Sequence, residues 1–170
     1  RRRHSAGIPT PEPDMPSHLT DRLSLAAQLL TVLLLGLMAG FFATYSANVN
    51  LATPELDGPT YAQVQSAFNR HVRHAGFFAC FLGPLPLGLL ALASADRREG
   101  WWRLLALTVI AYALGIVLFT REVNLPLNHL TESWTATTMP TDWATVREAW
   151  NRANLWRSGL SLVLFAGGLV

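Results

Sequence analysis

Two groups of amide, indole and guanidinium side chains stand at the edges of long apolar segments. Residues 124–128 read Asn-Leu-Pro-Leu-Asn, and residues 150–157 read Trp-Asn-Arg-Ala-Asn-Leu-Trp-Arg. Such groups are costly near hydrocarbon unless they pair with one another or line a functional site. Their placement predicts a small integral membrane protein with a polar site near one membrane face.

The second group has helical spacing. Trp150, Asn154 and Arg157 follow the i, i+4, i+7 pattern and therefore share one helix face, which Trp143 and Arg147 extend. Indole rings stack on flat ligands, and a guanidinium binds an anionic oxygen. The same residue types also anchor helices at the membrane interface, which is the alternative interpretation. Arg157 lies a turn inside the apolar segment, where a charge needs a partner.

The first group surrounds Pro126. A proline disfavours helical backbone at the residue before it, so the sequence predicts that the third apolar helix ends near Leu125. Asn124 and Asn128 can then cap freed backbone groups or bind a ligand, and both alternatives stay open. Arg121 and Glu122, just before them, are expected to form an ion pair.

Histidines form a third candidate group. An HxxH pattern on a helix can bind a metal, but no HExxH or paired ExxH pattern is present and nearby arginines would repel a cation. An unperturbed imidazole titrates near neutrality, so the same histidines are candidate general bases. The pattern is formed by His71 and His74, and Asn69 and Arg73 share the helix face next to theirs. The candidate metal ligands are His71, His74, His129 and Glu132.

Composition supports a membrane protein. The chain has 170 residues, of which 51% are hydrophobic and 14% charged, against roughly 25% charged in soluble domains. A bilayer core needs about 20 helical residues. We therefore expect an all-α, integral membrane four-helix bundle with helical extensions in its first and third loops. The expected spans are about 23–45, 75–95, 101–120 and 155–170.

Several further features shape this layout. Residues 1–22, with four prolines between Ile8 and Pro16, are expected to form a disordered or extended tail, and residues 23–170 a single domain. Pro84 and Pro86 predict a kink in the second span. Gly36 and Gly40 form a GxxxG motif typical of close helix packing. Thr141 is the expected N-cap of a helix that leads into the fourth span.

Arginine distribution predicts the orientation. The tail and the short loop 96–100 are rich in arginine and are expected in the cytoplasm, which leaves loops 46–74 and 121–154 exoplasmic. The chain contains arginine but no lysine, which we interpret as a GC-rich coding bias. The expected location is a bacterial plasma membrane. The net charge of +2 is too small, and the arginines too scattered, to indicate nucleic-acid binding. The single cysteine, Cys80, allows no disulfide framework.

Four of these segments resemble the anthrone oxygenase-like family of small four-helix membrane proteins. They are residues 36–46, the Asn69-Arg70 pair, and the motifs at 124–128 and 150–157, and the resemblance covers about 29–170. It implies that the family's signature positions are Asn124, Pro126, Asn128, Trp150, Asn154 and Arg157.

That family's named activity is oxidation of an anthrone, a polyketide-like aromatic ketone, to an anthraquinone by O2 without metal or flavin. The resemblance implies a monooxygenase in which a base removes a substrate proton and the resulting anion is stabilised by donors. The candidate bases are His129, His71 and His74. The candidate donors are Arg157, Asn154, Asn128 and Asn124. The candidate substrate-binding residues are Trp150, Trp143, Trp134, Asn69 and Arg73.

Two other functions stay open. One is a non-catalytic scaffold whose polar face docks a partner membrane protein or a second copy. The other is a metal-dependent membrane oxidoreductase that uses the loop histidines. A transporter is disfavoured because no acidic residue lies inside a span and no inverted repeat is visible. An enzyme should enclose the asparagines and Arg157, whereas a scaffold should expose them.

Overall fold

The computed structural model describes residues 17–170, and this part of the chain is helical with no strand. The first long helix, α1 (Ser17–Thr44), continues without a break through three short segments. They are the π-helical η1 (Tyr45–Val49), α2 (Asn50–Ala52) and the 3₁₀ segment η2 (Thr53–Glu55). The next three helices are α3 (Gly58–Val72), α4 (Ala75–Leu82) and α5 (Pro84–Ser94).

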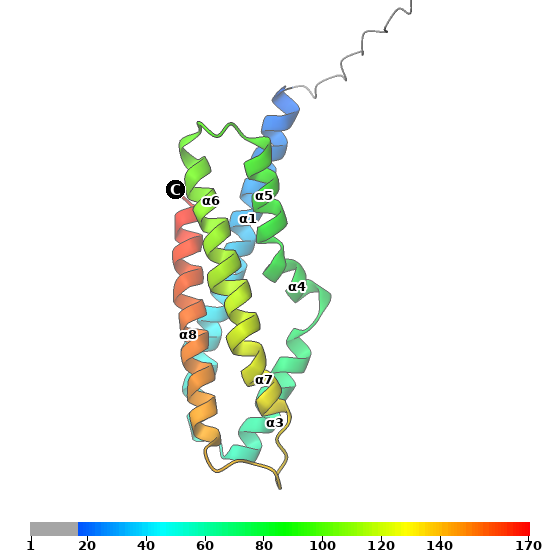
Figure 1. Cartoon of the computed structure of the whole chain (residues 1–170), viewed down its shortest axis with the longest axis vertical. Helices are drawn as coiled ribbons and strands as arrows, with labels where there is room; N and C mark the ends of the chain where they lie inside the picture. Colours follow the sequence, from blue (N-terminus) through cyan, green and yellow to red (C-terminus); the bar gives the residue numbers. More distant parts are fainter. Residues whose placement is uncertain (1–16) are drawn as a thin grey trace, which may run out of the picture.

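The second half contains two long helical rods. The first is α6 (Gly100–Tyr112), followed by the π-helical η3 (Ala113–Leu118) and η4 (Thr120–Asn124) and by α7 (Leu125–Glu132). The last is α8 (Trp143–Gly168). Figure 1 shows α1, α5, α6 and α8 side by side as a bundle, with α3 and α7 at its lower end. We call α3, α7 and residues 143–150 of α8 the cap.

Large apolar side chains fill the bundle interior. Phe42 and Leu35 of α1, Tyr112 of α6 and Leu164 of α8 belong to one buried cluster, each 7% exposed or less. A second cluster, around Ala91 and Val109, joins α1, α5 and α6. These contacts bind the four helices together and leave the other apolar faces on the outside.

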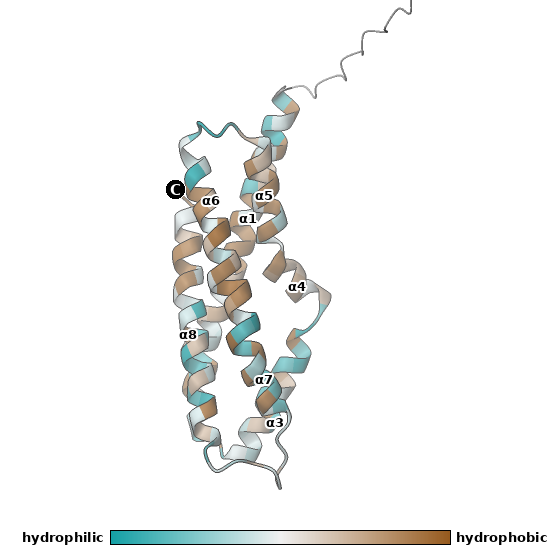
Figure 2. Ribbon diagram, in the orientation of Figure 1, coloured by the Kyte–Doolittle hydropathy of each residue, from teal (hydrophilic) through white to brown (hydrophobic). Residues whose placement is uncertain are grey.

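Within residues 17–170, three helical segments are long and apolar enough to cross a membrane: 18–55, 75–94 and 100–132. Figure 2 shows their apolar residues concentrated between the two ends of the bundle, whereas polar residues lie in the cap and in the α5–α6 loop at the opposite end. The first half of α8 is polar, and the expected fourth span at 155–170 stays a prediction. The beginning of α1, the α5–α6 loop and the end of α8 lie at one end of the molecule, opposite the cap (Figure 1).

The prediction that the third helix ends near Leu125 is wrong. Leu125 has helical backbone angles (φ −64°, ψ −43°), and the helix continues through Pro126 to Glu132. A proline normally clashes with the carbonyl four residues earlier. The π-helical turn of η4, directly before it, changes the hydrogen-bond register there and accommodates the ring.

The first loop also differs from expectation. The first helix extends to Glu55 and so reaches ten residues beyond the expected end at 45. Its start at Ser17 makes residues 17–22 helical, while the rest of the expected tail lies outside the described residues. The helical extension expected in the first loop exists as α3, which ends at Val72 and is separate from α4. His74 adopts extended angles (φ −120°, ψ 162°), and its Nδ1 accepts a hydrogen bond from the Phe77 amide at 3.2 Å.

Smaller expectations have mixed outcomes. The kink near Pro84 is confirmed, because α4 and α5 meet at Gly83 with a change of direction that Figure 1 shows. The Arg121–Glu122 ion pair is confirmed at 3.3 Å. Thr141 is not the N-cap, because α8 begins one residue later, after Asp142.

Candidate functional site

The polar face of α8 is buried at the level where the bundle meets the cap. Arg157 is 6% exposed and Asn154 only 1%. Arg157 Nη2 donates to Asn154 Oδ1 at 2.8 Å, and its Nη1 donates to Thr120 Oγ1 of η4 at 3.3 Å. The guanidinium therefore links α8 to η4, which lies in the continuous helical segment from α6 to α7.

The same network continues into the first helix. Asn154 Nδ2 donates to Ser46 Oγ of η1 at 2.8 Å, and Ser46 Oγ lies 2.7 Å from Ser158 Oγ. Ser158 Oγ is also 3.0 Å from the Asn154 carbonyl oxygen, to which it can donate. Hydroxyl and amide groups thus fix the orientation of Asn154, which in turn orients Arg157.

Arg157 is held by neutral groups alone. Its Cζ lies 4.5 Å from the centroid of the Phe42 ring and 5.8 Å from that of Trp150. It takes part in none of the ion pairs that residues 17–170 form, and its buried Nε has no hydrogen-bond partner there. A buried cation without a carboxylate is costly, and π faces offset only part of that cost. The arrangement therefore favours binding of an anionic oxygen.

Asn124 contributes a second group without a partner. It is 1% exposed, and within the described chain neither its Nδ2 nor its Oδ1 has a hydrogen-bond partner. Each such buried group costs about 1–3 kcal/mol. Four residues before it, Thr120 contacts Arg157; four residues after it, Asn128 Oδ1 accepts from Trp150 Nε1 at 2.7 Å. Because these spacings share one helix side, Asn124 lies between two contacts with α8.

A third chain of hydrogen bonds approaches from α3. Tyr45 donates its hydroxyl proton to Gln65 Oε1 at 2.9 Å, and Gln65 Nε2 donates to Asn69 Oδ1 at 3.1 Å. The Tyr45 ring lies 5.0 Å from that of Trp150. Asn69 is buried, and its Nδ2 lacks a partner among the residues described. These contacts join the cap to the Arg157 network.

Two π-helical turns supply several of the residues in these networks. Tyr45 and Ser46 open η1, while Thr120 and Asn124 are the first and last residues of η4. A π-helical turn widens the helix locally and is frequent at functional sites. Here both turns face α8 at the level of Asn154 and Arg157, which identifies this level as the candidate site.

Other predicted site residues lie apart from this network. His71, His74 and His129 are exposed, and Arg73 forms a 2.6 Å ion pair with Glu132. No group of three or more histidine, cysteine, aspartate or glutamate side chains that could hold a metal occurs between residues 17 and 170.

The two remaining tryptophans lie in or beside the cap. Trp143 packs against the Tyr61 ring at 5.7 Å and beside Gly58. Trp134 is half-buried just after α7, in the loop that leads to α8. Within residues 17–170, neither residue forms an aromatic pair or a hydrogen bond with the Arg157 network.

Sequence reasoning missed several residues of the network: Tyr45, Ser46, Gln65, Thr120 and Ser158. Tyr45 and Ser46 lie in the segment that carries the family resemblance, which was the available signal. Gln65 and Ser158 look like ordinary polar residues of amphipathic helices, and only the packing of α3 and α8 reveals their partners.

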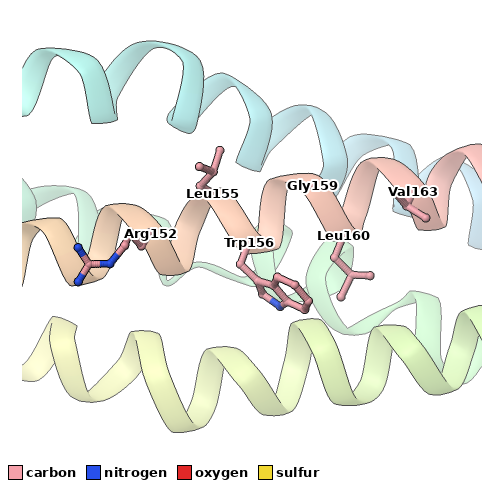
Figure 3. A pocket seen from close by; sticks show the side chains of 6 residues that line it. All are labelled: Arg152, Leu155, Trp156, Gly159, Leu160 and Val163. Carbon is pink, nitrogen blue, oxygen red and sulfur yellow. The ribbon is translucent and has the colours of Figure 1, made fainter.

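The outer face of α8 carries a separate, open hollow of about 590 Å³. Figure 3 shows Trp156 and Leu160 pointing from α8 toward the neighbouring helix, with Arg152 at one end. Its lining is almost entirely apolar, and Arg157 and Asn154 are not part of it. The hollow therefore belongs to the outer surface of α8 and is distinct from the buried polar site.

The fold and the site define a class: an all-helical bundle with membrane-length apolar helices and an interior arginine surrounded by amides and aromatic rings. Within that class, the chain belongs to the anthrone oxygenase family, whose model matches residues 25–167. No curated protein and no solved structure matches the chain significantly. The family resemblance noted in the sequence is thereby confirmed.

Proposed function

We propose that this protein is a membrane-bound oxygenase that converts a hydrophobic, enolisable aromatic ketone of the anthrone type into a quinone with O2. The observation that carries the proposal is the buried Arg157, held beside Asn154 without a carboxylate partner in the described chain. Family membership supplies the reaction class.

The proposed reaction consumes one ketone and one O2 and yields one quinone and one water. The substrate loses a proton from the carbon opposite its carbonyl and becomes an enolate. The enolate passes one electron to O2, and the two radicals combine into a peroxide anion at that carbon. This anion takes a proton back from the base and becomes a hydroperoxide. Cleavage of the O–O bond with loss of the remaining hydrogen as water leaves the second carbonyl. The proposal requires no metal or flavin.

Arg157 would bind the enolate oxygen, since a guanidinium favours the anion over the neutral ketone. Asn124 would donate to the same or a neighbouring oxygen through its free Nδ2. Asn154 would act through Arg157, whose Nη2 it holds at 2.8 Å. The Trp150 ring, fixed by its hydrogen bond to Asn128, would pack against the flat substrate.

The proton acceptor remains a histidine in this proposal. His129 follows Asn128 directly in α7 and is exposed, so water can connect it to the site. His71 and His74 are the alternatives. Because Arg157 stabilises the enolate, an exposed imidazole is sufficient as the proton acceptor.

The scaffold alternative finds less support. A docking surface should expose the polar face of α8, whereas Arg157, Asn154 and Trp150 are each no more than 6% exposed. An enclosed polar face surrounded by aromatic rings is typical of a small-molecule site.

We further propose that α8 crosses the membrane as a fourth span, with its outer apolar residues against lipid. The tail and the 96–100 loop would lie in the cytoplasm of a bacterial cell and the cap outside, following the arginine distribution. Cysteine variants in the 96–100 loop and in the loop after α7 test this orientation, because an impermeant maleimide should label only the second in intact cells.

The experiment that tests the function is O2 uptake by the purified, metal-analysed protein given anthrone. The matched control is 10,10-dimethylanthrone, which has the same carbonyl but no removable proton at the reacting carbon. We expect the protein to form quinone from anthrone faster than the spontaneous reaction, and to form none from the dimethyl control. No enhancement from folded protein contradicts the proposal, and activity that a chelator abolishes supports the metal-dependent alternative.

A further inference from the structure

A second buried polar cluster lies inside the cap, and the proposed oxidation does not use it. Its members are Tyr61 of α3 and Trp143 and Arg147 of α8. Tyr61 is fully buried and Arg147 is 9% exposed. Arg147 precedes Arg157 by ten residues, which is about 15 Å along a helix, so the two guanidinium groups belong to separate sites.

Trp143 joins the other two members. Its ring lies 5.7 Å from the Tyr61 ring, and the Arg147 Cζ lies 5.0 Å from its centroid. A Cβ added to Gly58 would come within 3.0 Å of the indole, so the α3 backbone packs directly on this ring. Tyr61, Arg147 and the α3 backbone thus all lie against the indole of Trp143.

Two hydrogen-bonding atoms of the cluster are unused. Tyr61 Oη and Arg147 Nε are buried, and neither has a partner in the part of the chain described. Thr131 lies near the phenol, but its own hydroxyl donates to the Leu127 carbonyl at 3.0 Å. Burial raises the pKa of Tyr61 to about 12, so the phenol is protonated at neutral pH and can donate.

The charge of Arg147 is only weakly compensated. Its Nη2 lies 3.9 Å from Glu148 Oε1, at the outer limit of an ion pair. The Glu148 side chain is 59% exposed and is also 4.0 Å from Arg152. A mostly solvated carboxylate shared between two arginines contributes little. The cluster thus presents a buried cation and two unused donors to whatever enters it.

We propose that the cap binds a small carboxylate, with Arg147 contacting one of its oxygens and the Tyr61 hydroxyl donating to the other. The planar guanidinium fork matches a carboxylate, and two donors match its two oxygens. This binding goes beyond the proposed oxidation and does not depend on it.

The test is ¹⁹F NMR of 4-fluorobenzoate with the purified full chain in neutral detergent, with 4-fluorobenzamide as the uncharged control. We expect the acid alone to bind. Arg147→Gln should weaken binding at least tenfold, and Tyr61→Phe about fivefold, the size of one hydrogen bond. Arg152→Gln should leave binding unchanged, because Arg152 is exposed and lies outside the cluster.

Each other result counts against the cap site. Absence of binding at millimolar benzoate, or equal binding of the amide, overturns it. Loss of binding in Arg157→Gln but not in Arg147→Gln assigns the anion to the deeper site and also overturns it. If Tyr61→Phe binds benzoate as the wild type does and only unfolds at higher temperature, the hydroxyl has no ligand and the proposed two-point contact is wrong.

Discussion

Arg157 donates from Nη2 to Asn154 Oδ1 at 2.8 Å, and Asn154 in turn donates from Nδ2 to Ser46 Oγ at 2.8 Å. The arginine is thus oriented by an amide that is itself fixed from the first helix. Neither contact supplies a negative charge. A cation that is oriented but not neutralised is suited to binding an anion that forms during a reaction.

The first prediction concerns the stability of Arg157→Leu. Replacing this cation, which has no carboxylate in the described chain, by an apolar residue removes a costly buried charge but leaves Asn154 Oδ1 without its donor, at a cost of about 1–3 kcal/mol, so the two effects should largely cancel. Thermal unfolding in detergent measures this. A large loss of stability would mean that Arg157 is a structural residue and would contradict the binding role given to it.

Asn124→Leu should separate stability from activity. Removal of two buried amide atoms without partners should raise the free energy of unfolding by about 1–3 kcal/mol. Turnover of an anthrone should fall, because the free donor is lost. Asn48→Leu, at an exposed position of η1, is the matched control and should change neither quantity. A destabilised Asn124→Leu protein would show that the amide has a partner in the folded chain.

Two glycines test the helix packing. A Cβ on Gly88 would lie 2.5 Å from Val109 Cγ2, and a β-branched valine yields poorly, so Gly88→Ala should destabilise the α5–α6 contact by about 1–3 kcal/mol. A Cβ on Gly40 meets nothing within 4 Å. Gly40→Ala should therefore be neutral or stabilise by up to about 1 kcal/mol through helix propensity. Equal unfolding temperatures for the two variants would contradict this packing.

The N-cap residue Asp57 predicts how the stability of the fold depends on pH. Its side chain accepts from the Thr60 amide at 2.8 Å as the N-cap of α3, and these hydrogen bonds hold the pKa of its carboxyl below the ordinary value. A lowered folded-state pKa means that the cap stabilises α3 at pH values above the unfolded pKa, and that this is lost as pH falls through the folded pKa.

The measurement is thermal unfolding from neutral pH into the acid range. Asp57→Asn keeps a capping oxygen without a titratable group, so it should retain most of the stability but lose this part of the pH dependence. Asp57→Ala should lose both. An unchanged acid response in Asp57→Asn would assign the pH dependence to other carboxylates.

The sequence predicted the class of fold because the apolar segments are long and nearly free of charge. It failed where backbone geometry departs from the ordinary helix. Pro126 signals a helix end in most contexts, yet the π-helical turn of η4 carries the helix past it. The sequence does not distinguish a π-helical turn from an α-helical one. For the same reason it did not predict that the first helix extends beyond Tyr45 through η1.

The helical spacing of Trp150, Asn154 and Arg157 correctly predicted a shared face, because i, i+4, i+7 geometry is independent of tertiary structure. The partners of that face could not be predicted. Ser46, Thr120 and Gln65 are ordinary polar residues until the packing of the other helices against α8 brings them into contact. His71, His74 and His129 were predicted as bases or metal ligands from their chemistry alone, but they are exposed and lie outside the Arg157 network.

The most direct test compares quinone formation from anthrone by wild-type protein, Arg157→Leu and Arg152→Leu, each at matched concentration of folded protein. Arg152 is exposed on the outer hollow of the same helix and serves as the control for charge removal. Wild-type activity with Arg152→Leu, together with a rate at the spontaneous background for Arg157→Leu, is the result expected. Equal turnover by all three proteins would contradict the assignment of Arg157 as the group that stabilises the substrate anion.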